Sequence, residues 1–277
     1  MSDLEPMKRL LTIQDVSCVG QCSTTVALPL VSACGVECAV LPPAILSNHT
    51  GFARWCVTDL AEFLPQVEAE WTAQSIRFDA FYTGYVCESH IDPILSIMRT
   101  CAAPGALRFV DPAMADDGRL YAGFAGDFPA KMARLCAGAD YLLPNLTEAA
   151  LLTGREPKMR LGRRETEELV AALHGLGARH VILTGVGFGD GELGTAVSDG
   201  RTVDYDFNPR LPRRSHGTGD VFASVFAGAV MRGLAAFEAA ALAADVVCEA
   251  IRLTEPDHRY GVNFEKTIPM LVRRLEK

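Results

Sequence analysis

The 277-residue sequence predicts an α/β fold with a mostly parallel, doubly wound sheet, helices on both faces and an antiparallel hairpin at one edge. Up to Gly185, short apolar runs alternate with segments of helical apolar spacing, which indicates parallel strands joined by crossover helices. Two alternating runs joined by Asp199-Gly200 then give a strong hairpin signal. Because no Pro/Ser-rich linker or internal repeat interrupts the chain, we expect a single domain over residues 1–277.

The first strand is expected in the apolar run Arg9–Asp15, followed by a glycine-containing loop and a helical pattern that ends at Gly35. The later runs expected as strands are VECAVLP, FDAFYTG, LRFVDP, DYLLPN and ARHVILTG. Helices are expected near Ser89–Cys101, Phe128–Cys136 and Glu165–Gly175, and within TEAALLTG. The remainder, from Thr218 onward, is expected to be wholly helical.

The composition favours an enzyme acting on a small molecule. Hydrophobic residues make up 49% and charged residues 22% of the chain, as in globular proteins generally. A net charge of -8 argues against binding to nucleic-acid phosphates. The N-terminus lacks the apolar core of a signal peptide, and the apolar stretch Leu234–Ile251 is interrupted by acidic residues. We therefore expect a cytoplasmic protein with no membrane partner.

The nine cysteines do not predict a metal or disulfide framework. Their number is odd, and their spacing contains no CxxC pair and no matching histidine pair. A zinc site is therefore disfavoured, and most cysteines are expected to be small buried residues in a reducing compartment.

The positions after the expected strands are polar. In doubly wound sheets the ligand lies beyond the carboxyl ends of the strands, so these positions are candidate site residues. They are Gln14-Asp15, Gly84-Tyr85, Asp111-Pro112, Pro144-Asn145 with Glu148, and Thr184-Gly185.

The sequence Gly217-Thr218-Gly219-Asp220 stands directly before a run of small apolar residues that predicts a buried helix. Glycines allow a tight turn and close approach of a ligand, and the first amides of a helix have no intrahelical acceptor. Such a turn can bind a phosphate that gains charge during transfer. Asp220 would lie at the first turn as a general base, although an acidic residue there could simply stabilise the helix dipole.

Five segments in order resemble the motifs of pyridoxal kinases in the ribokinase superfamily, over nearly the whole chain. They are SNHTGFARW (47–55), TGY (83–85), VDPAMADDGRLY (110–121), LPNLTEAALLTG (143–154) and GTGD (217–220). The resemblance implies a ribokinase-like three-layer α/β/α fold. It also implies transfer of a phosphoryl group from ATP to the 5′-hydroxymethyl group of pyridoxal, pyridoxine or pyridoxamine. A homodimer is expected on the same ground.

The resemblance also implies the roles of individual residues. Asp220 is the implied base, and Gly217, Thr218 and Gly219 form the implied anion hole. The residues implied for ATP are Asp111, Asn145, Glu148 and Thr184, with Asp116 and Glu148 for Mg²⁺. The residues implied for the substrate are Asp15, Asn48, His49, Thr50, Tyr85 and Tyr121. A monovalent cation such as K⁺ is left open as a further cofactor. Residues Met114–Tyr121 are a candidate lid, because they follow a strand end.

Some residues have a plainer alternative. Asn48 could make a turn, His49 could be a hydrogen-bonded loop histidine and Tyr85 could belong to the core. Asp15 could cap the loop before Gly20 and never meet the substrate.

The sequence departs from the family at several positions. Pyridoxal kinases usually carry serine at the position of Asp15, threonine at that of Leu143 and glycine at that of Ala115. His216 before the Gly-Thr-Gly turn resembles hydroxymethylpyrimidine kinases, although those usually carry cysteine at the position of Asp220. These departures weaken the substrate assignment more than the reaction type.

Four other functions stay open. They are a hydroxymethylpyrimidine kinase, a sugar or nucleoside kinase, a non-catalytic nucleotide-binding module and a dinucleotide oxidoreductase. The last is prompted by the glycines of GVGFGDG (185–191), but these lead into a hairpin, whereas the dinucleotide fingerprint opens a helix. The non-catalytic module is disfavoured because a binding protein has no use for the base Asp220.

Overall fold

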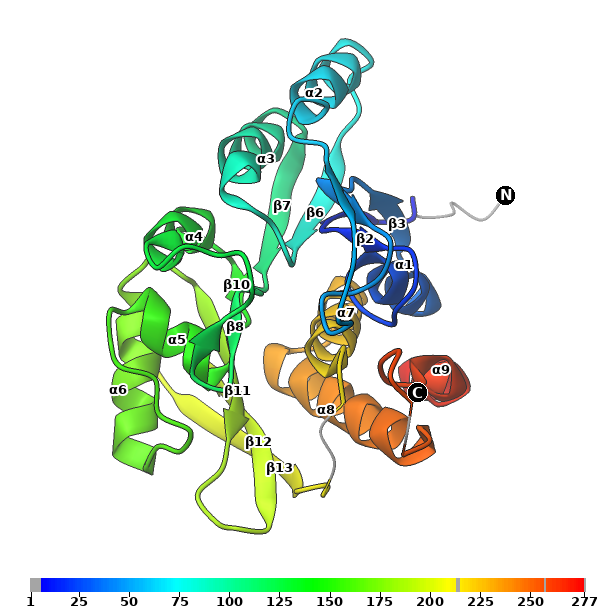
Figure 1. Cartoon of the computed structure of the whole chain (residues 1–277). Coiled ribbons are helices and arrows are strands. Elements are labelled where there is room, and N and C mark those ends of the chain that lie inside the picture. Colours follow the sequence, from blue (N-terminus) through cyan, green and yellow to red (C-terminus); the bar gives the residue numbers. More distant parts are fainter. Residues whose placement is uncertain (1–5, 213–214, 257, 277) are drawn as a thin grey trace.

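A computed structural model describes residues 6–212, 215–256 and 258–276 (Figure 1). The strands are β1 (Arg9–Ile13), β2 (Val16–Ser17), β3 (Glu37–Val40), β4 (Ala44–Leu46), β5 (Val57–Asp59), β6 (Phe78–Thr83), β7 (Ala102–Val110), β8 (Ala115–Asp116), β9 (Arg119–Leu120), β10 (Tyr141–Leu142), β11 (His180–Val186), β12 (Glu192–Ser198) and β13 (Val203–Pro209). The helices are α1 (Thr24–Ala33), α2 (Leu64–Ala73), α3 (Glu88–Thr100), α4 (Phe128–Cys136), α5 (Leu146–Leu152), α6 (Arg163–His174), α7 (Thr218–Met231), α8 (Ala236–Leu253), the 3₁₀ turn η1 (Phe264–Thr267) and α9 (Ile268–Leu275).

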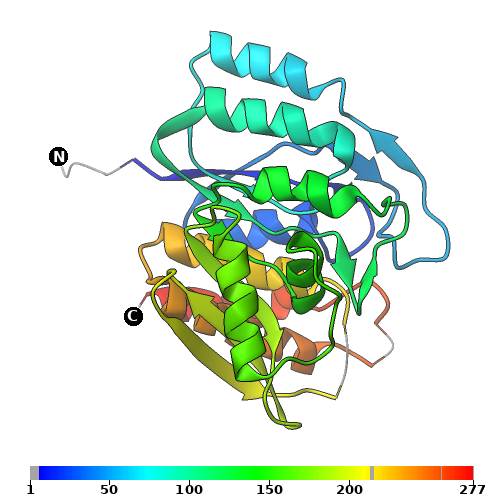
Figure 2. The ribbon, with the colours of Figure 1, turned by 90° about the vertical axis from the view of Figure 1, so that its left-hand side faces the viewer.

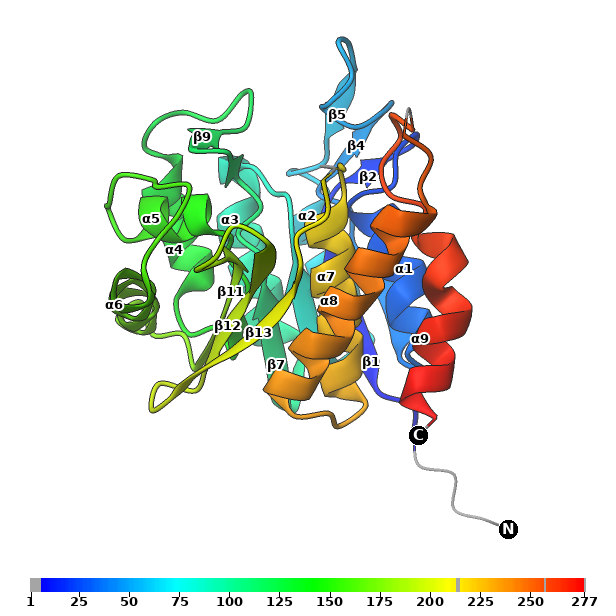
Figure 3. The same ribbon diagram turned by 90° about the horizontal axis from the view of Figure 1, so that it is seen from below.

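The main sheet has eight strands in the order β13-β12-β11-β10-β7-β6-β1-β3. The strands from β11 to β3 are parallel, whereas β12 and β13 pair antiparallel at one edge. This arrangement confirms the predicted parallel sheet with its hairpin edge. Two small sheets, β2-β4-β5 and β8-β9, lie beyond the carboxyl ends of the parallel strands (Figure 3).

Helices cover both faces of the main sheet and form two apolar cores. One core packs residues of α3, α4, α5 and α6 against the sheet, and the other packs residues of α1, α7 and α8 against the opposite face. Figures 1 and 3 show these two groups of helices on opposite sides of the strands. Figure 2 shows α6 lying over the strands of the hairpin edge. The three layers confirm the predicted fold class.

Helix α7 is buried along most of its length. Every residue from Val221 to Met231 is buried, which explains why the segment contains only small and apolar side chains. At Gly228 a Cβ atom would lie 2.6 Å from the sulfur of Cys34, so α1 and α7 pack too closely for any side chain there. Such tight packing fixes the position of the helix and of the turn before it.

Two parts of the chain differ from the expectation. The segment after Thr218 is not wholly helical, because α8 ends at Leu253 and residues 254–256 and 258–263 lie outside any helix. Pro256 and Gly261, which has φ +120°, break the helical path. The sequence also gave no indication of α2 or of the β4-β5 pair.

Of the nine cysteines, all unpaired thiols, four are buried and two are exposed, so fewer are buried than expected. Within the described residues, no helix is long and apolar enough to cross a membrane. The expectation about a signal peptide falls partly on residues 1–5, which lie outside the described residues. The single domain stays a prediction.

Candidate active site

The predicted anion hole is the turn that opens α7. Gly217 has φ +81°, and a Cβ atom there would lie 2.0 Å from the carbonyl oxygen of Gln21, so only glycine fits. The helical hydrogen bonding begins with the amide of Val221, which donates to the carbonyl of Gly217. The amides of residues 218–220 therefore precede the helical ladder. Space around Gly219 is open, because nothing lies within 4 Å of a Cβ built there. This turn can accept an anion.

Asp220 lies in the first turn of α7, next to the anion hole. Burial raises the pKa of its carboxyl group to about 7, the nearby carboxylate of Asp15 also raises it, and a hydrogen bond from the backbone of Ser23 lowers it. A carboxylate with a pKa near neutrality is well matched to general-base catalysis. The geometry therefore allows the role that the sequence predicted for Asp220.

Acidic side chains from three elements face the space beside Asp220. Burial raises the pKa of Asp111, which follows β7, and the charges of Glu148 and Asp220 raise it further. Burial likewise raises the pKa of Glu148, at the start of α5, to about 8, and Asp116 at the tip of β8 adds to the effect. A cation bound beside these carboxyl groups would favour their ionised forms.

The start of α5 is built around Glu148. Asn145 and Glu148 form a capping box, in which each side chain accepts a hydrogen bond of 2.9 Å from the other's amide. Glu148 also accepts bonds from the amides of Met114 (3.2 Å) and Ala115 (3.5 Å), and the Asn145 amide donates to the Ala115 carbonyl at 2.8 Å. These contacts attach the β8-β9 hairpin to α5.

Thr184 lies on the neighbouring strand β11. Its amide donates to the carbonyl of Pro144 at 2.9 Å, and it forms an isolated bridge with Asn145. The residues predicted for ATP and metal are thus brought to one edge of the sheet. Among the described residues, no group of three or more His, Cys, Asp or Glu side chains is arranged as a complete metal site.

Asp15 follows β1 and is only 3% exposed. Its carboxylate accepts a hydrogen bond of 3.0 Å from the hydroxyl of Ser17 and another from Ser23. Burial raises its pKa. Because its charge also raises the pKa of Asp220, the two carboxylates lie within electrostatic reach of each other.

The other residues predicted for the substrate lie in loops around this centre. The side chain of Asn48 is held by the loop itself, donating to the carbonyl of Arg54 at 2.9 Å. Thr50 is half-buried in the same loop. Tyr85 follows β6 and packs against Phe124, with ring centroids 5.2 Å apart. Their contacts with a substrate stay predictions.

Both ring nitrogens of His49 are engaged by the protein. Nδ1 accepts the amide of Gly51 at 3.1 Å, so Nε2 carries the proton and donates to the carbonyl of Arg259 at 3.0 Å. The ring also stacks on His216 with centroids 4.2 Å apart. This geometry favours the alternative of a hydrogen-bonded loop histidine. Partial desolvation of the ring and the neighbouring His49 lower the pKa of His216 to about 4, so its ring is neutral at pH 7.

Tyr121 follows the β8-β9 hairpin. Its amide donates to the carbonyl of Met114 at 2.8 Å, which closes the base of the hairpin. Burial raises the pKa of its phenol, and the charges of Glu148, Asp111, Asp116 and Asp220 raise it further. The ring therefore lies beside the acidic centre, and closure of the hairpin as a lid stays a prediction.

Ser23 also contacts the candidate site, although the sequence did not predict it. This residue precedes α1 with φ +50°, an uncommon value for a residue with a side chain. Its backbone binds the carboxylate of Asp220 and its side chain binds that of Asp15. Nothing in the sequence around it distinguishes this serine from an ordinary helix cap.

Known proteins resemble the chain over most of its length. A family model described as phosphomethylpyrimidine kinase matches residues 31–265. Pyridoxal kinase of Leifsonia xyli subsp. xyli is 29% identical over 238 residues, with 81% of each chain covered. The crystal structure of pyridoxal kinase from Lactobacillus plantarum is 34% identical with a TM-score of 0.89, and the match covers 98% of this chain and 99% of that one.

A second solved structure, from Bacteroides thetaiotaomicron, is named as a phosphomethylpyrimidine kinase and was crystallised with pyridoxal. It is 31% identical with a TM-score of 0.91, and the match covers 98% of this chain and 96% of that one. The glycine turn before a buried helix, the aspartate beside it and these similarities agree: the chain belongs to the pyridoxal kinase and phosphomethylpyrimidine kinase family of the ribokinase superfamily.

Proposed function

We propose that the protein transfers the terminal phosphoryl group of ATP to the 5′-hydroxymethyl group of a B6 vitamer: pyridoxal, pyridoxine or pyridoxamine. The observation that carries the proposal is Asp220, a half-buried aspartate whose carboxyl group has a pKa of about 7 and which lies in the first turn after a glycine turn. A protein that only binds nucleotide would need the turn but not a base tuned to neutrality.

In this reaction Asp220 accepts the proton of the 5′-hydroxyl group, which makes the oxygen nucleophilic. The amides of residues 218–220 donate hydrogen bonds to the transferring phosphoryl oxygens, where negative charge develops.

The residues at the strand ends fit a magnesium nucleotide. Mg²⁺ commonly binds through one or two carboxylates, several waters and substrate phosphates, and does not need a closed cage of protein ligands. Asp116 and Glu148 would hold the ion, and Asp111, Asn145 and Thr184 would contact the nucleotide. When bound, magnesium ATP supplies the phosphoryl group and neutralises the charge that accumulates on it.

A second candidate is a hydroxymethylpyrimidine kinase. The favouring observation is His216, whose neutral ring stacks on His49 directly before the anion hole. The B6 assignment is preferred because Asp220 stands where hydroxymethylpyrimidine kinases usually carry cysteine. The pyridoxal bound to the Bacteroides protein adds support from a relative.

The test is release of ADP from ATP and Mg²⁺ on addition of pyridoxal, with the product identified by mass as pyridoxal 5′-phosphate. No ADP release with any B6 vitamer would overturn the proposal. The proposal extends to a cytoplasmic homodimer, for which light scattering in solution measures the mass. The requirement for a monovalent cation is tested by comparing the rate of ADP release in K⁺ and in Na⁺ at equal ionic strength; a higher rate in K⁺ is the expected result.

A further inference from the structure

The backbone of Gln21 packs against Gly217, the first residue of the predicted anion hole. Its carbonyl oxygen fills the space where Gly217 would carry a Cβ atom, 2.0 Å from the oxygen. On the other side lies Gly261, where a Cβ atom would be 2.8 Å from the same oxygen and 2.9 Å from the Cβ of Gln21. The carbonyl of Gln21 is thus enclosed by two glycines of positive φ, one of which opens the anion hole.

The segment of residues 258–263 is the second support of the same turn. The amide of Val262 donates to the carbonyl of His216 at 3.2 Å, and the carbonyl of Tyr260 accepts the amide of Gln21 at 2.7 Å. A movement of this segment would therefore displace both His216 and Gln21. His216 is joined directly to Gly217, and Gly217 packs against the backbone of Gln21.

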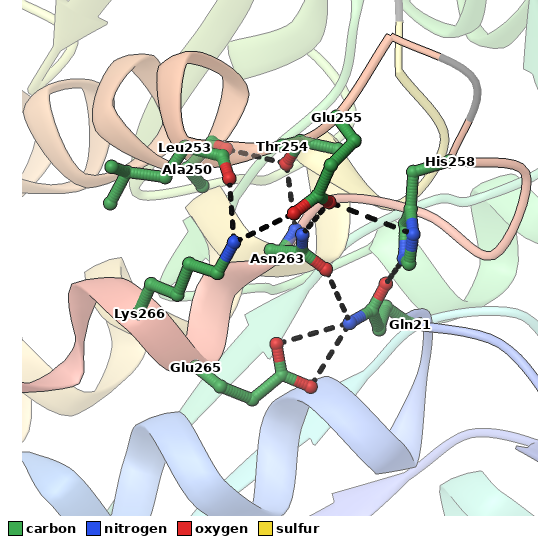
Figure 4. Close-up of polar contacts among 9 residues, drawn as sticks. All are labelled: Gln21, Ala250, Leu253, Thr254, Glu255, His258, Asn263, Glu265 and Lys266. Atoms are coloured by element: carbon green, nitrogen blue, oxygen red, sulfur yellow. Dashed lines mark hydrogen bonds and ion pairs between the residues drawn. The ribbon is translucent and has the colours of Figure 1, made fainter.

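The side chain of Gln21 fixes this segment at both of its ends. Its Oε1 accepts a hydrogen bond from His258 at 3.0 Å, and its Nε2 donates to Asn263 at 3.3 Å and to the carboxylate of Glu265 at 3.0 and 3.1 Å. Figure 4 shows the amide of Gln21 lying between these three side chains. Only an amide of this length supplies an acceptor on one side and a donor on the other.

The far side of the same segment is anchored to the end of α8. Glu255 accepts hydrogen bonds from Asn263 at 2.6 Å and from Lys266 at 3.0 Å, and Lys266 also donates to the carbonyl of Leu253 at 3.0 Å (Figure 4). Asn263, which is 9% exposed, therefore connects Gln21 to α8. The network holds an irregular segment that has no helix or strand to fix it.

We propose that Gln21 is a positioning residue for phosphoryl transfer, which sets the anion hole through residues 258–263 and Gly217 without touching the substrate. The inference rests on the proposed kinase activity. A turn held loosely still binds ATP and the vitamer, but its amides are less well aimed at the charge that develops in transfer. The effect should therefore fall on kcat rather than on KM.

The test is Gln21→Glu, which keeps the length of the side chain but replaces the donor by a carboxylate facing Glu265. We expect kcat to fall about tenfold, less than the about 10²–10³ that loss of one oxyanion donor costs, with KM for pyridoxal changed by less than about twofold. Hydrogen exchange of the amides of residues 217–220 should become faster.

The exchanged pair Gln21→Glu with Glu265→Gln restores a donor facing an acceptor. It should recover part of the lost kcat, to within about threefold of the wild type, because the two changes are coupled; the hydrogen bond from Gln21 to Asn263 is not restored. Glu265→Gln alone keeps an acceptor for Gln21 and should change little. Arg274→Gln removes one positive charge from an ion pair with Asp245 that lies outside this network, and is the control for net charge.

The inference is overturned if Gln21→Glu leaves both kcat and the exchange of residues 217–220 at wild-type values. It is also overturned if the exchanged pair recovers the melting temperature but not kcat, or if KM rises as much as kcat falls. A wild-type protein without kinase activity would defeat the proposed function, whereas the exchange measurement would still decide whether Gln21 fixes the turn.

Discussion

At the scale of single residues, Asp220 carries the proposed chemistry. Asp220→Asn keeps the size of the side chain and an acceptor for the amide of Ser23, but it removes the base. We expect kcat to fall by about 10²–10⁴, with ATP affinity by calorimetry nearly unchanged. Near-normal turnover in this variant would contradict the mechanism.

The pKa of Asp220 also predicts two pH dependences. Because only the ionised base is active, kcat/KM should rise with pH through about 7. Burial raises the folded-state pKa above the unfolded value, so the resulting stabilisation is present in acid and is lost as pH rises toward 7.

Since asparagine cannot ionise, Asp220→Asn should melt about 2–4 °C above the wild type near pH 8, with a smaller difference near pH 5. Thermal melts across this range check the sign. A variant that is less stable than the wild type at the higher pH would contradict the raised pKa.

We expect Asp15 to influence substrate choice. An ionised carboxylate pairs best with a protonated pyridine ring. Burial raises the pKa of Asp15 and so disfavours its ionised form, and a protonated ring beside it would favour that form again. Asp15→Ser should therefore change the ranking of kcat/KM among pyridoxal, pyridoxamine and hydroxymethylpyrimidine, and flatten the alkaline fall. It should also shift the acid limb to lower pH, since Asp15 raises the pKa of Asp220. An unchanged ranking and pH profile would leave Asp15 a loop residue.

At the scale of elements, α5 links the proposed metal site to the β8-β9 hairpin through Glu148. Glu148→Gln should raise the Mg²⁺ concentration for half-maximal rate by about tenfold, and leave the affinity for vitamer without nucleotide unchanged. The matched control is Glu165→Gln, which alters the capping box of α6, where Glu165 accepts the amide of Gly162 at 2.9 Å. Unchanged magnesium dependence in Glu148→Gln would move this residue out of the metal site.

The elements that the sequence predicted are those with clear apolar patterns. Strands β1, β6 and β11 are largely buried, and α7 is buried from Val221 to Met231, so their apolar runs predicted them. Helix α2 was missed because it buries only Leu64, and β5 was missed because all three of its residues are exposed. An element without a buried face leaves little periodicity to detect.

At the scale of the whole molecule, ligands of doubly wound sheets lie beyond the carboxyl ends of the strands, and this rule predicted which side chains lie close together in the site. It placed Asp15, Asp111 and Glu148 at one edge, and the structure brings them together with Asp220. Ser23 and Gln21 were not predictable in this way. The role of Ser23 depends on its positive φ. The role of Gln21 depends on contacts with His258 and Asn263, which lie 237 and 242 positions further along the chain.

The most direct test of the central claim is one substrate panel, in which ADP release is measured with pyridoxal, pyridoxine, pyridoxamine, hydroxymethylpyrimidine and ribose under the same conditions. A site with an aspartate base and a pyridine-binding edge predicts the highest kcat/KM for a B6 vitamer, with activity lost in Asp220→Asn. A higher kcat/KM for hydroxymethylpyrimidine or ribose than for every vitamer would contradict it.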